Sequence, residues 1–167
     1  MNASWICFIQ TPEGEFAAQY TDKGLSRLDF PQPGRRLAKP SSGEIPGKIK
    51  RWHQDTCRAV LKVLKGAAPQ SMPPLDLSGS TYFQRAVWRA LQKIKPGLSL
   101  SYADVAACLG RPRAARAVGG ACGANPIPLL IPCHRVVASG GRLGGYSGGL
   151  DWKKTLLRRE GCTLAEK

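Results

Sequence analysis

The sequence lacks any hydrophobic run long enough to cross a membrane. Within its 167 residues, no uncharged apolar segment approaches the roughly 18 to 20 residues that a membrane-spanning helix needs. The first segment also lacks the basic start, apolar run and small-residue cleavage site that together indicate a signal peptide. We therefore expect a cytoplasmic protein that does not span a membrane, of a size that fits one domain or two small ones.

Closely spaced cysteine pairs are also missing. None of the six cysteines forms a Cys-x-x-Cys pair or another short framework spacing. This argues for reduced thiols over a disulfide scaffold, so any cysteine chemistry is thiol chemistry. The six are Cys7, Cys57, Cys108, Cys122, Cys133 and Cys162.

Acidic residues are scarce, above all in the second half. The chain has 25 Lys and Arg against 11 Asp and Glu, a net charge of +14, and no acidic residue lies between Asp104 and Asp151. A local excess of this kind attracts polyanions through phosphate contacts and counterion release. Nucleic acid is therefore the first partner to consider and an anionic membrane surface the second, with a merely solvated basic face as the alternative.

The N-terminal part alternates short β-prone runs with turn signals. Strands are predicted over residues 5–10, 15–20 and 25–30, and apolar spacing predicts a helix over 46–65 that covers the resulting antiparallel sheet. The proline-rich stretch 66–80 is predicted to connect two subdomains. We predict an α/β (α+β) fold with an N-terminal sheet-plus-helix domain and linker, residues 1–77, and a mostly helical domain, residues 78–167.

The second domain is predicted to contain a helix-turn-helix. A helix is expected over 81–93, and Ser101 and Asp104 form a candidate capping box for a short helix ending at Gly110. Arg111-Pro112 suits the entrance of a second helix, continued through 114–121. That helix consists almost entirely of small residues around one arginine, a pattern found more often in tight internal packing than in recognition elements.

Cys133 is the candidate nucleophile. It follows a segment restrained by three prolines, and His134 and Arg135 stand directly after it. A free thiol has a pKa near 8.5, and basic neighbours raise its thiolate fraction. For most of the other cysteines, the simpler interpretation is a buried, inert side chain.

The segment Pro132-Cys133-His134-Arg135-Val136 resembles the signature of the O6-alkylguanine-DNA alkyltransferases, also called methylated-DNA–protein-cysteine methyltransferases. The resemblance covers nearly all of residues 80–161, with the motifs in order. Its further motifs are Phe83-Gln84, Val87-Trp88, Ser101-Tyr102, Arg116-Ala117-Val118-Gly119, Asn125-Pro126, Gly145-Tyr146-Ser147-Gly148-Gly149-Leu150, Leu156-Leu157 and Glu160-Gly161.

The resemblance implies a DNA repair protein that acts by direct reversal of alkylation damage, without a cofactor. Cys133 would take the alkyl group from O6-alkylguanine in double-stranded DNA and end as a thioether. A thioether does not hydrolyse, so each molecule would act once. The protein would be a monomer with no membrane partner, and cooperative binding along DNA stays open.

The resemblance also implies five catalytic residues. His134 would take the proton of Cys133 through a water, and Glu160 would hold the imidazole. Tyr102 would donate a hydrogen bond at the purine ring, and Asn125 would tie the helix pair to the active-site segment through backbone hydrogen bonds. This relay predicts a pKa for Cys133 below that of a free cysteine.

Four residues are implied at the substrate. Ser147 would donate to the oxygen that loses its alkyl group, and Tyr146 would border the pocket. Arg135 is also implied to bind the substrate. The backbone carbonyls of Cys133 and Val136 would accept from the guanine amino group, which rejects adenine.

The helix-turn-helix is implied to lie in the minor groove while the damaged nucleotide is rotated out of the duplex. Arg116 would enter the vacated stack. The other residues implied to contact the DNA are Ala115, Ala117, Gly119 and Ser101.

Three alternatives are weighed against this interpretation. A lesion-sensing relative without activity would lack the cysteine at position 133. A thiol hydrolase or acyltransferase would turn over and would not need the basic second half. A zinc site could use His53, Cys57 and Cys7, but no complete four-ligand set is apparent, and we expect no metal. Cys122 stands where the family commonly has a larger apolar residue, which leaves the preferred alkyl size open.

Overall fold

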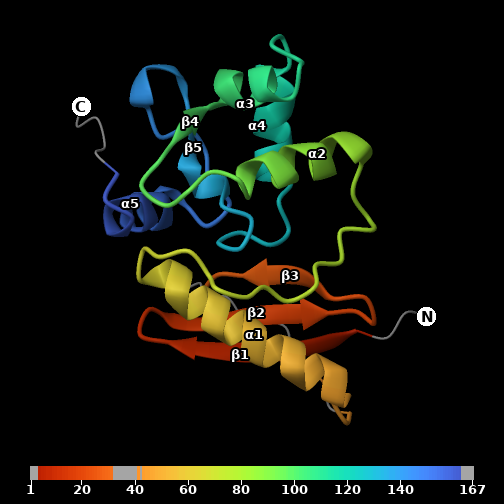
Figure 1. Cartoon of the computed structure of the whole chain (residues 1–167). Coiled ribbons are helices and arrows are strands. Elements are labelled where there is room, and N and C mark those ends of the chain that lie inside the picture. Colours follow the sequence, from red (N-terminus) through yellow and green to blue (C-terminus); the bar gives the residue numbers. More distant parts are fainter. Residues whose placement is uncertain (1–3, 32–40, 42, 163–167) are drawn as a thin grey trace.

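The computed structural model describes residues 4–31, 41 and 43–162. Its N-terminal part is a three-stranded antiparallel meander of β1 (Trp5–Thr11), β2 (Gly14–Tyr20) and β3 (Leu25–Asp29). Figure 1 shows this sheet on one side of the molecule and the later helices on the other. The predicted strands are confirmed, and three of their six ends differ from the prediction by one residue.

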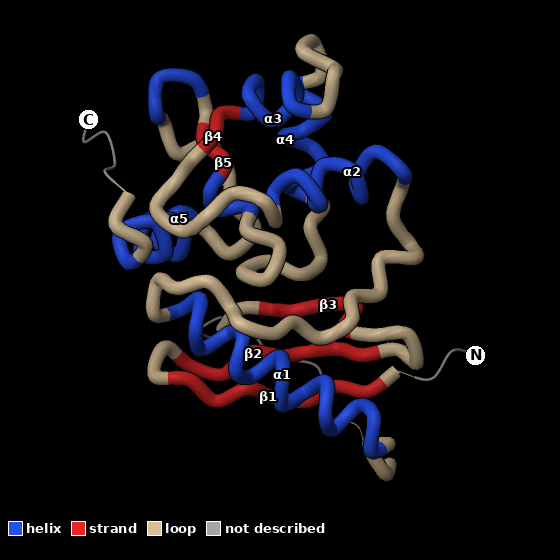
Figure 2. The backbone as a smooth tube through the Cα atoms, viewed as in Figure 1, coloured by secondary structure: helices blue, strands red, loops and turns tan. Residues whose placement is uncertain are grey.

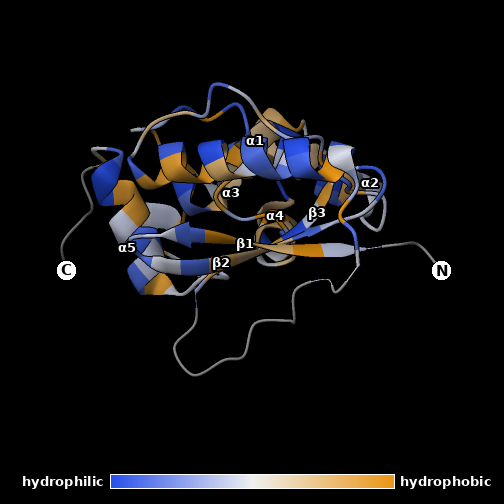
Figure 3. Ribbon diagram, turned by 90° about the horizontal axis from the view of Figure 1, so that it is seen from below, coloured by the Kyte–Doolittle hydropathy of each residue, from blue (hydrophilic) through white to orange (hydrophobic). Residues whose placement is uncertain are grey.

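Helix α1 (Gly47–Leu64) lies along one face of the sheet, as the apolar spacing predicts. Figure 3 views this packing from below, with α1 above the strands. Ile49, Val60 and Val63 point into the core, while the basic residues of the helix are exposed. The amphipathic pattern therefore fixes which side of α1 meets the sheet.

The C-terminal part is mostly helical, as Figure 2 shows by its predominance of helix and loop over strand. It also contains a two-residue parallel pair that the sequence did not predict, since two residues are too few for an alternation signal. Its elements are α2 (Tyr82–Leu91), β4 (Leu100–Ser101), α3 (Tyr102–Cys108), α4 (Ala115–Gly123), the 3-10 helix η1 (Cys133–Arg135), β5 (Val136–Val137), the 3-10 turn η2 (Ser139–Gly141) and α5 (Leu150–Arg159).

The predicted capping box at the start of α3 is present. Ser101 Oγ accepts from Asp104 N at 3.1 Å, and Asp104 Oδ2 accepts from Ser101 N at 2.8 Å. Thr81 and Gln84 form a second such box at α2. Both helices thus begin where side chains satisfy backbone N–H groups that have no partner inside the helix.

The predicted entrance to the second helix of the pair is wrong by three residues. Arg111-Pro112 belongs to a turn in which Ala114 N donates to Arg111 O at 2.9 Å, and α4 begins only at Ala115. The chain leaves α3 through Gly110, whose φ of 68° favours glycine. Proline is therefore used here in the turn, where a fixed φ is also favourable.

The two parts share one hydrophobic core. The connecting segment runs beside β3, where Leu25 N donates to Pro74 O and Asp76 N donates to Leu25 O, each at 2.8 Å. On the other side, the rings of Phe30 and Trp152 lie 4.9 Å apart. The division between residues 77 and 78 stays a prediction. None of the described helices is long and apolar enough to span a membrane.

Candidate active site

Cys133 lies in η1 at the end of a tightly held segment. Asn125 Nδ2 donates to Ile131 O at 2.8 Å, and Asn125 Oδ1 accepts from Ile127 N at 3.0 Å. These are the backbone hydrogen bonds expected of Asn125. Leu129, buried in the same segment, has a φ of 71°, a conformation that costs energy for a residue other than glycine. The approach to Cys133 is thus fixed by the fold.

The Cys133 thiol is almost completely buried and receives one side-chain hydrogen bond. Asn125 Nδ2 donates to Cys133 Sγ at 3.1 Å, a contact that could not be predicted from sequence patterns. Burial raises the pKa of Cys133 to about 11, although the Asn125 amide and the Lys153 ammonium act in the opposite direction. The expectation of a lowered thiol pKa is wrong, because loss of water outweighs the favourable contacts.

His134 and Glu160 form a buried pair. His134 Nε2 lies 2.9 Å from Glu160 Oε1, and both side chains have no exposed surface. Because a carboxylate accepts, we assign the proton to Nε2, which leaves Nδ1 as an acceptor. Among the described residues, Nδ1 has no hydrogen-bond partner. Burial lowers the pKa of His134 despite the opposing effect of Glu160, so the imidazole is neutral at pH 7.

Arg135 holds the other side of Glu160. Its Nη2 lies 2.8 Å from Glu160 Oε1, its Nε lies 3.0 Å from Oε2, and its Nη1 donates to Ile94 O. Burial opposes ionisation of Glu160, but hydrogen bonds from His134 and Arg135 lower its pKa. The placement of Arg135 at the substrate is therefore corrected, because its buried guanidinium is occupied by the carboxylate.

A cavity of about 330 Å³ opens at Cys133, and we call it the acceptor cavity. It brings together four residues expected at the reacting groups: Cys133 of η1, Tyr102 of α3, and Tyr146 and Ser147 of the segment before α5. Gly119 of α4, expected at the DNA, also lines it. Arg135 and Val136 are not part of its wall. The lining residues are Tyr102, Gly119, Cys122, Gly123, Cys133, Gly145, Tyr146 and Ser147.

Tyr102 is held between two glycines. A Cβ atom added at Gly119 would lie 3.9 Å from the Tyr102 ring, and one added at Gly144 would lie 2.8 Å from its hydroxyl oxygen. The φ of 66° at Gly144 also favours glycine. Burial raises the pKa of Tyr102, so its hydroxyl keeps the proton that a hydrogen-bond donor needs.

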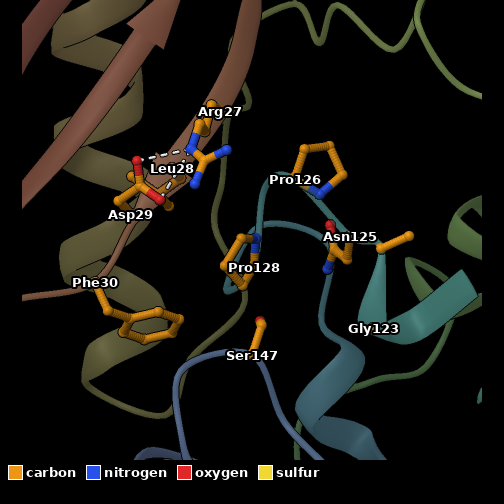
Figure 4. Close-up of a pocket in the computed structure, with 10 residues that line it drawn as sticks. Arg27, Leu28, Asp29, Phe30, Gly123, Asn125, Pro126, Pro128 and Ser147 are labelled. Carbon is orange, nitrogen blue, oxygen red and sulfur yellow. Dashed lines mark hydrogen bonds and ion pairs between the residues drawn. The ribbon is translucent and has the colours of Figure 1, made fainter. Parts of the chain in front are cut away.

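A second hollow of about 290 Å³ adjoins this cavity and shares Gly123 and Ser147 with it. Figure 4 shows Ser147 beneath Pro128, with the Arg27–Asp29 ion pair across the hollow on β3. Ser147 thus stands at the border between the acceptor cavity and the junction of the sheet with the helical part.

The backbone carbonyls expected at the guanine amino group already accept hydrogen bonds inside the protein. Cys133 O accepts from Val136 N, and Val136 O accepts from Lys153 Nζ at 2.6 Å. Each carbonyl oxygen has a second lone pair, so these contacts leave room for a further donor. Lys153 was missed, although it shares the buried face of α5 with Leu156 and Leu157, a spacing that could have revealed it.

The residues expected at DNA fall into two groups. Arg116 and Ala117 are exposed on α4, and Ala115 and Gly119 are partly buried there. Ser101 differs, because its hydroxyl donates to Asp104 Oδ2 at 2.7 Å within the capping box. Its side chain is used to begin α3, and its contact with DNA stays a prediction.

The residues of the zinc alternative lie around α1. His53 Nδ1 is 3.1 Å from the Tyr20 hydroxyl, and His53 Nε2 is 3.6 Å from Cys57 Sγ. Within the described ranges, no group of three His, Cys, Asp or Glu side chains is placed to hold a metal ion.

Comparisons with known proteins agree with this geometry. A family model described as the DNA-binding domain of 6-O-methylguanine DNA methyltransferase matches residues 82–162. A methylated-DNA–protein-cysteine methyltransferase of Methanosarcina barkeri is 38% identical over 155 residues, which cover 91% of this chain and 94% of the relative. One of Salmonella typhimurium is 55% identical over 149 residues, covering 87% and 81%.

A solved structure extends the likeness to the fold. The crystal structure of Mycobacterium tuberculosis OGT in complex with DNA matches with a TM-score of 0.73 and 33% identity, covering 92% of this chain and 90% of that one. The similarity therefore includes the N-terminal sheet, for which the sequence offered only a general shape. The chain belongs to the family of methylated-DNA–protein-cysteine methyltransferases.

Proposed function

We propose that Cys133 is the alkyl acceptor of this DNA repair methyltransferase and takes the alkyl group from O6-alkylguanine in double-stranded DNA. The observation that carries this assignment is the position of its thiol. Cys133 lines the acceptor cavity and receives a hydrogen bond from Asn125. The next residue, His134, is buried and paired with Glu160.

The transfer is a displacement at saturated carbon. Cys133 Sγ forms a bond to the alkyl carbon as the bond from that carbon to guanine O6 breaks, and the electron pair of that bond stays with the base. The thiol proton passes through a water to His134 Nδ1, the acceptor nitrogen of the pair. Glu160 then offsets the imidazolium charge. The product is a thioether, which does not hydrolyse, so one molecule repairs one lesion.

The leaving base needs donors for the charge it gains. Tyr102 donates at the purine ring, and Ser147 donates to the oxygen that loses the alkyl group. Tyr146 borders the pocket, and the second lone pairs of Cys133 O and Val136 O select the guanine amino group. The raised pKa of Tyr102 supports its role as donor.

The lesion reaches the cavity by rotation of its nucleotide out of the duplex, at a cost of roughly a few kcal/mol. The exposed Arg116 enters the vacated stack, and the small residues of α4 allow close approach to the minor groove. The net charge of +14 supports binding to phosphates. We further propose that the protein acts as a cytoplasmic monomer without a cofactor, divided into domains 1–77 and 78–167.

The test is peptide mapping after incubation with a duplex that carries one O6-methylguanine. The added methyl group should lie on Cys133, and Cys133→Ser should bind the duplex without removing the lesion. Exposed Cys108 provides the matched control, because Cys108→Ser should repair normally. A methyl group on another residue, or repair by Cys133→Ser, would refute the assignment.

A further inference from the structure

Lys153 is fully buried in α5, and within the described residues its ammonium group is bound only by backbone carbonyls. Its Nζ donates to Val136 O at 2.6 Å, to Gly145 O at 3.3 Å and to Leu143 O. An ammonium has three N–H donors, so these three contacts use all of them.

The three carbonyls belong to two segments that shape the acceptor cavity. Val136 is in β5, three residues after Cys133, whereas Leu143 and Gly145 precede Tyr146 and Ser147. Gly145, Tyr146 and Ser147 all line the cavity. Lys153 therefore joins the segment with the candidate donors to the strand that follows the acceptor cysteine.

No carboxylate of residues 4–31, 41 or 43–162 forms an ion pair with Lys153. The ion pairs found in the described part of the chain involve other residues, and the nearest acid along α5, Asp151, is exposed. Burying an ammonium away from water and without a counter-ion is costly. A buried cation beside a cavity where negative charge forms offsets part of that cost when the charge appears.

We propose that Lys153 is a positioning residue for alkyl transfer: it clamps residues 143–145 to β5, and its positive charge stabilises the anion that passes from Cys133 Sγ to the departing base. The inference rests on the proposed acceptor role of Cys133. It adds no covalent step, because the thiol proton still goes to His134 and Lys153 keeps all its protons.

Three titratable groups face this charge from the neighbouring elements. Cys133 and His134 belong to η1, and Cys122 belongs to α4. The ammonium lowers the pKa of both thiols, against the larger effect of burial, and it disfavours protonation of His134. The reactivity of Cys133 as a function of pH therefore reports on the charge of Lys153.

The experiment compares Lys153→Met and Lys153→Gln with the wild-type chain. Methionine removes the charge and all three donors at similar length, whereas glutamine removes the charge but keeps two donors. Lys154→Met is the matched control, because Lys154 is the exposed neighbour and its loss changes the net charge equally. Circular dichroism checks folding, and peptide mapping measures iodoacetamide labelling of Cys133 from pH 6 to 11. Transfer from a methylated duplex is measured in parallel.

Both Lys153 variants should shift the labelling profile of Cys133 to higher pH and slow its labelling at pH 7 by about tenfold, the factor that corresponds to one pKa unit. The labelling profile of Lys154→Met should overlay that of the wild type. In the duplex assay, Lys153→Met should lose more activity than Lys153→Gln, which keeps part of the clamp.

A Lys153→Met or Lys153→Gln profile that overlays the wild type would overturn the proposal. Failure of both variants to fold would also count against it, since Lys153 would then serve general stability. The labelling assay uses no alkylguanine, so it separates this inference from the acceptor role. If the wild-type chain transferred no methyl group to Cys133, the proposed function would fail whatever the labelling profiles showed.

Discussion

The carboxylate of Glu160 lies 2.9 Å from His134 Nε2, and both side chains are completely buried. Arg135 binds the same carboxylate, so the negative charge of Glu160 is already balanced when His134 is neutral. Together with the raised pKa of Cys133, this makes the resting pair a neutral thiol and a neutral imidazole. His134 therefore acts as a base during the transfer, and a preformed thiolate is not needed.

The first prediction concerns the pH profile of transfer from a free O6-alkylguanine base. The rate should fall below the lowered pKa of His134, where the base is protonated. It should stay level through neutral pH and rise only toward the pKa of Cys133 at about 11. The transfer rate at each pH is measured by stopping the reaction at set times and mapping the alkylated peptide. A midpoint near the free-thiol value of about 8.5 would contradict the buried neutral pair.

Glu160→Gln should destabilise the fold and slow the transfer. It leaves the buried Arg135 charge without a counter-ion, which costs about 3 kcal/mol. Urea unfolding measures the loss. Asp151→Asn is the control, since this exposed acid in the first turn of α5 should cost about 1 kcal/mol at most. Equal costs for the two variants would show that the Glu160 network contributes little.

The stability of the protein should also fall in acid. His134 has a lowered pKa in the folded state, so the unfolded chain takes up protons first as the pH drops below about 6.5. Glu160 also has a lowered pKa in the folded state, so it destabilises the folded state as the pH drops below its ordinary value of 4.5. The stabilisation by the Glu160 carboxylate is lost as the pH falls through the folded pKa. Thermal unfolding from pH 7 to about pH 2 should show Glu160→Gln approaching the wild type only below 4.5, where the stabilisation by the Glu160 carboxylate is lost. A constant gap would contradict the linkage.

Asn125→Ala should disturb the approach to Cys133. It leaves the buried Ile127 N–H without its side-chain partner and removes one of the two donors to Ile131 O. It also removes the donor to Cys133 Sγ, and the total loss should be about 2 kcal/mol or more. Labelling of Cys133 should move to higher pH. Exposed Gln92→Ala serves as the control. An unchanged labelling profile would mean that the Asn125 contact does not act on the thiol.

Arg116→Ala should slow repair in duplex DNA far more than reaction with a free alkylguanine base, because its proposed task is to fill the stack. Exposed Arg113→Ala removes an equal charge from the turn before α4 and should weaken duplex binding without this selective loss. The ratio of the two rates is the measurement. Equal losses on both substrates would make Arg116 a pocket or folding residue.

The sequence predicted the elements that depend on local pattern. The meander, α1 and the Ser101–Asp104 capping box follow from alternation, helical spacing and capping chemistry, all of which act within a few residues. The entrance of α4 was misplaced because Pro112 is as favourable in a turn as in a first helical turn. The two-residue pair of β4 and β5 depends on contacts between distant segments, which no local pattern records.

The candidate site was predicted from the family resemblance more than from spacing. The meeting of Cys133, Tyr102 and Ser147 at one cavity agrees with that resemblance. The role of Arg135 could not be found in this way, because a charged side chain in a sequence does not reveal what buries it. The burial of Lys153 follows from its spacing with Leu156 and Leu157, but the carbonyls that bind its ammonium group depend on the finished fold. The direction of the thiol pKa was wrong for the same reason, since desolvation depends on the finished fold.

The acceptor role of Cys133 is tested most directly by the intact mass of the protein during titration with a duplex that holds one O6-methylguanine. The account predicts that the mass rises by a single methyl group, that one lesion disappears per protein molecule, and that excess duplex adds nothing further. Fragmentation should place the group on Cys133. Repair of several lesions per molecule, or an unmodified protein after repair, would contradict it.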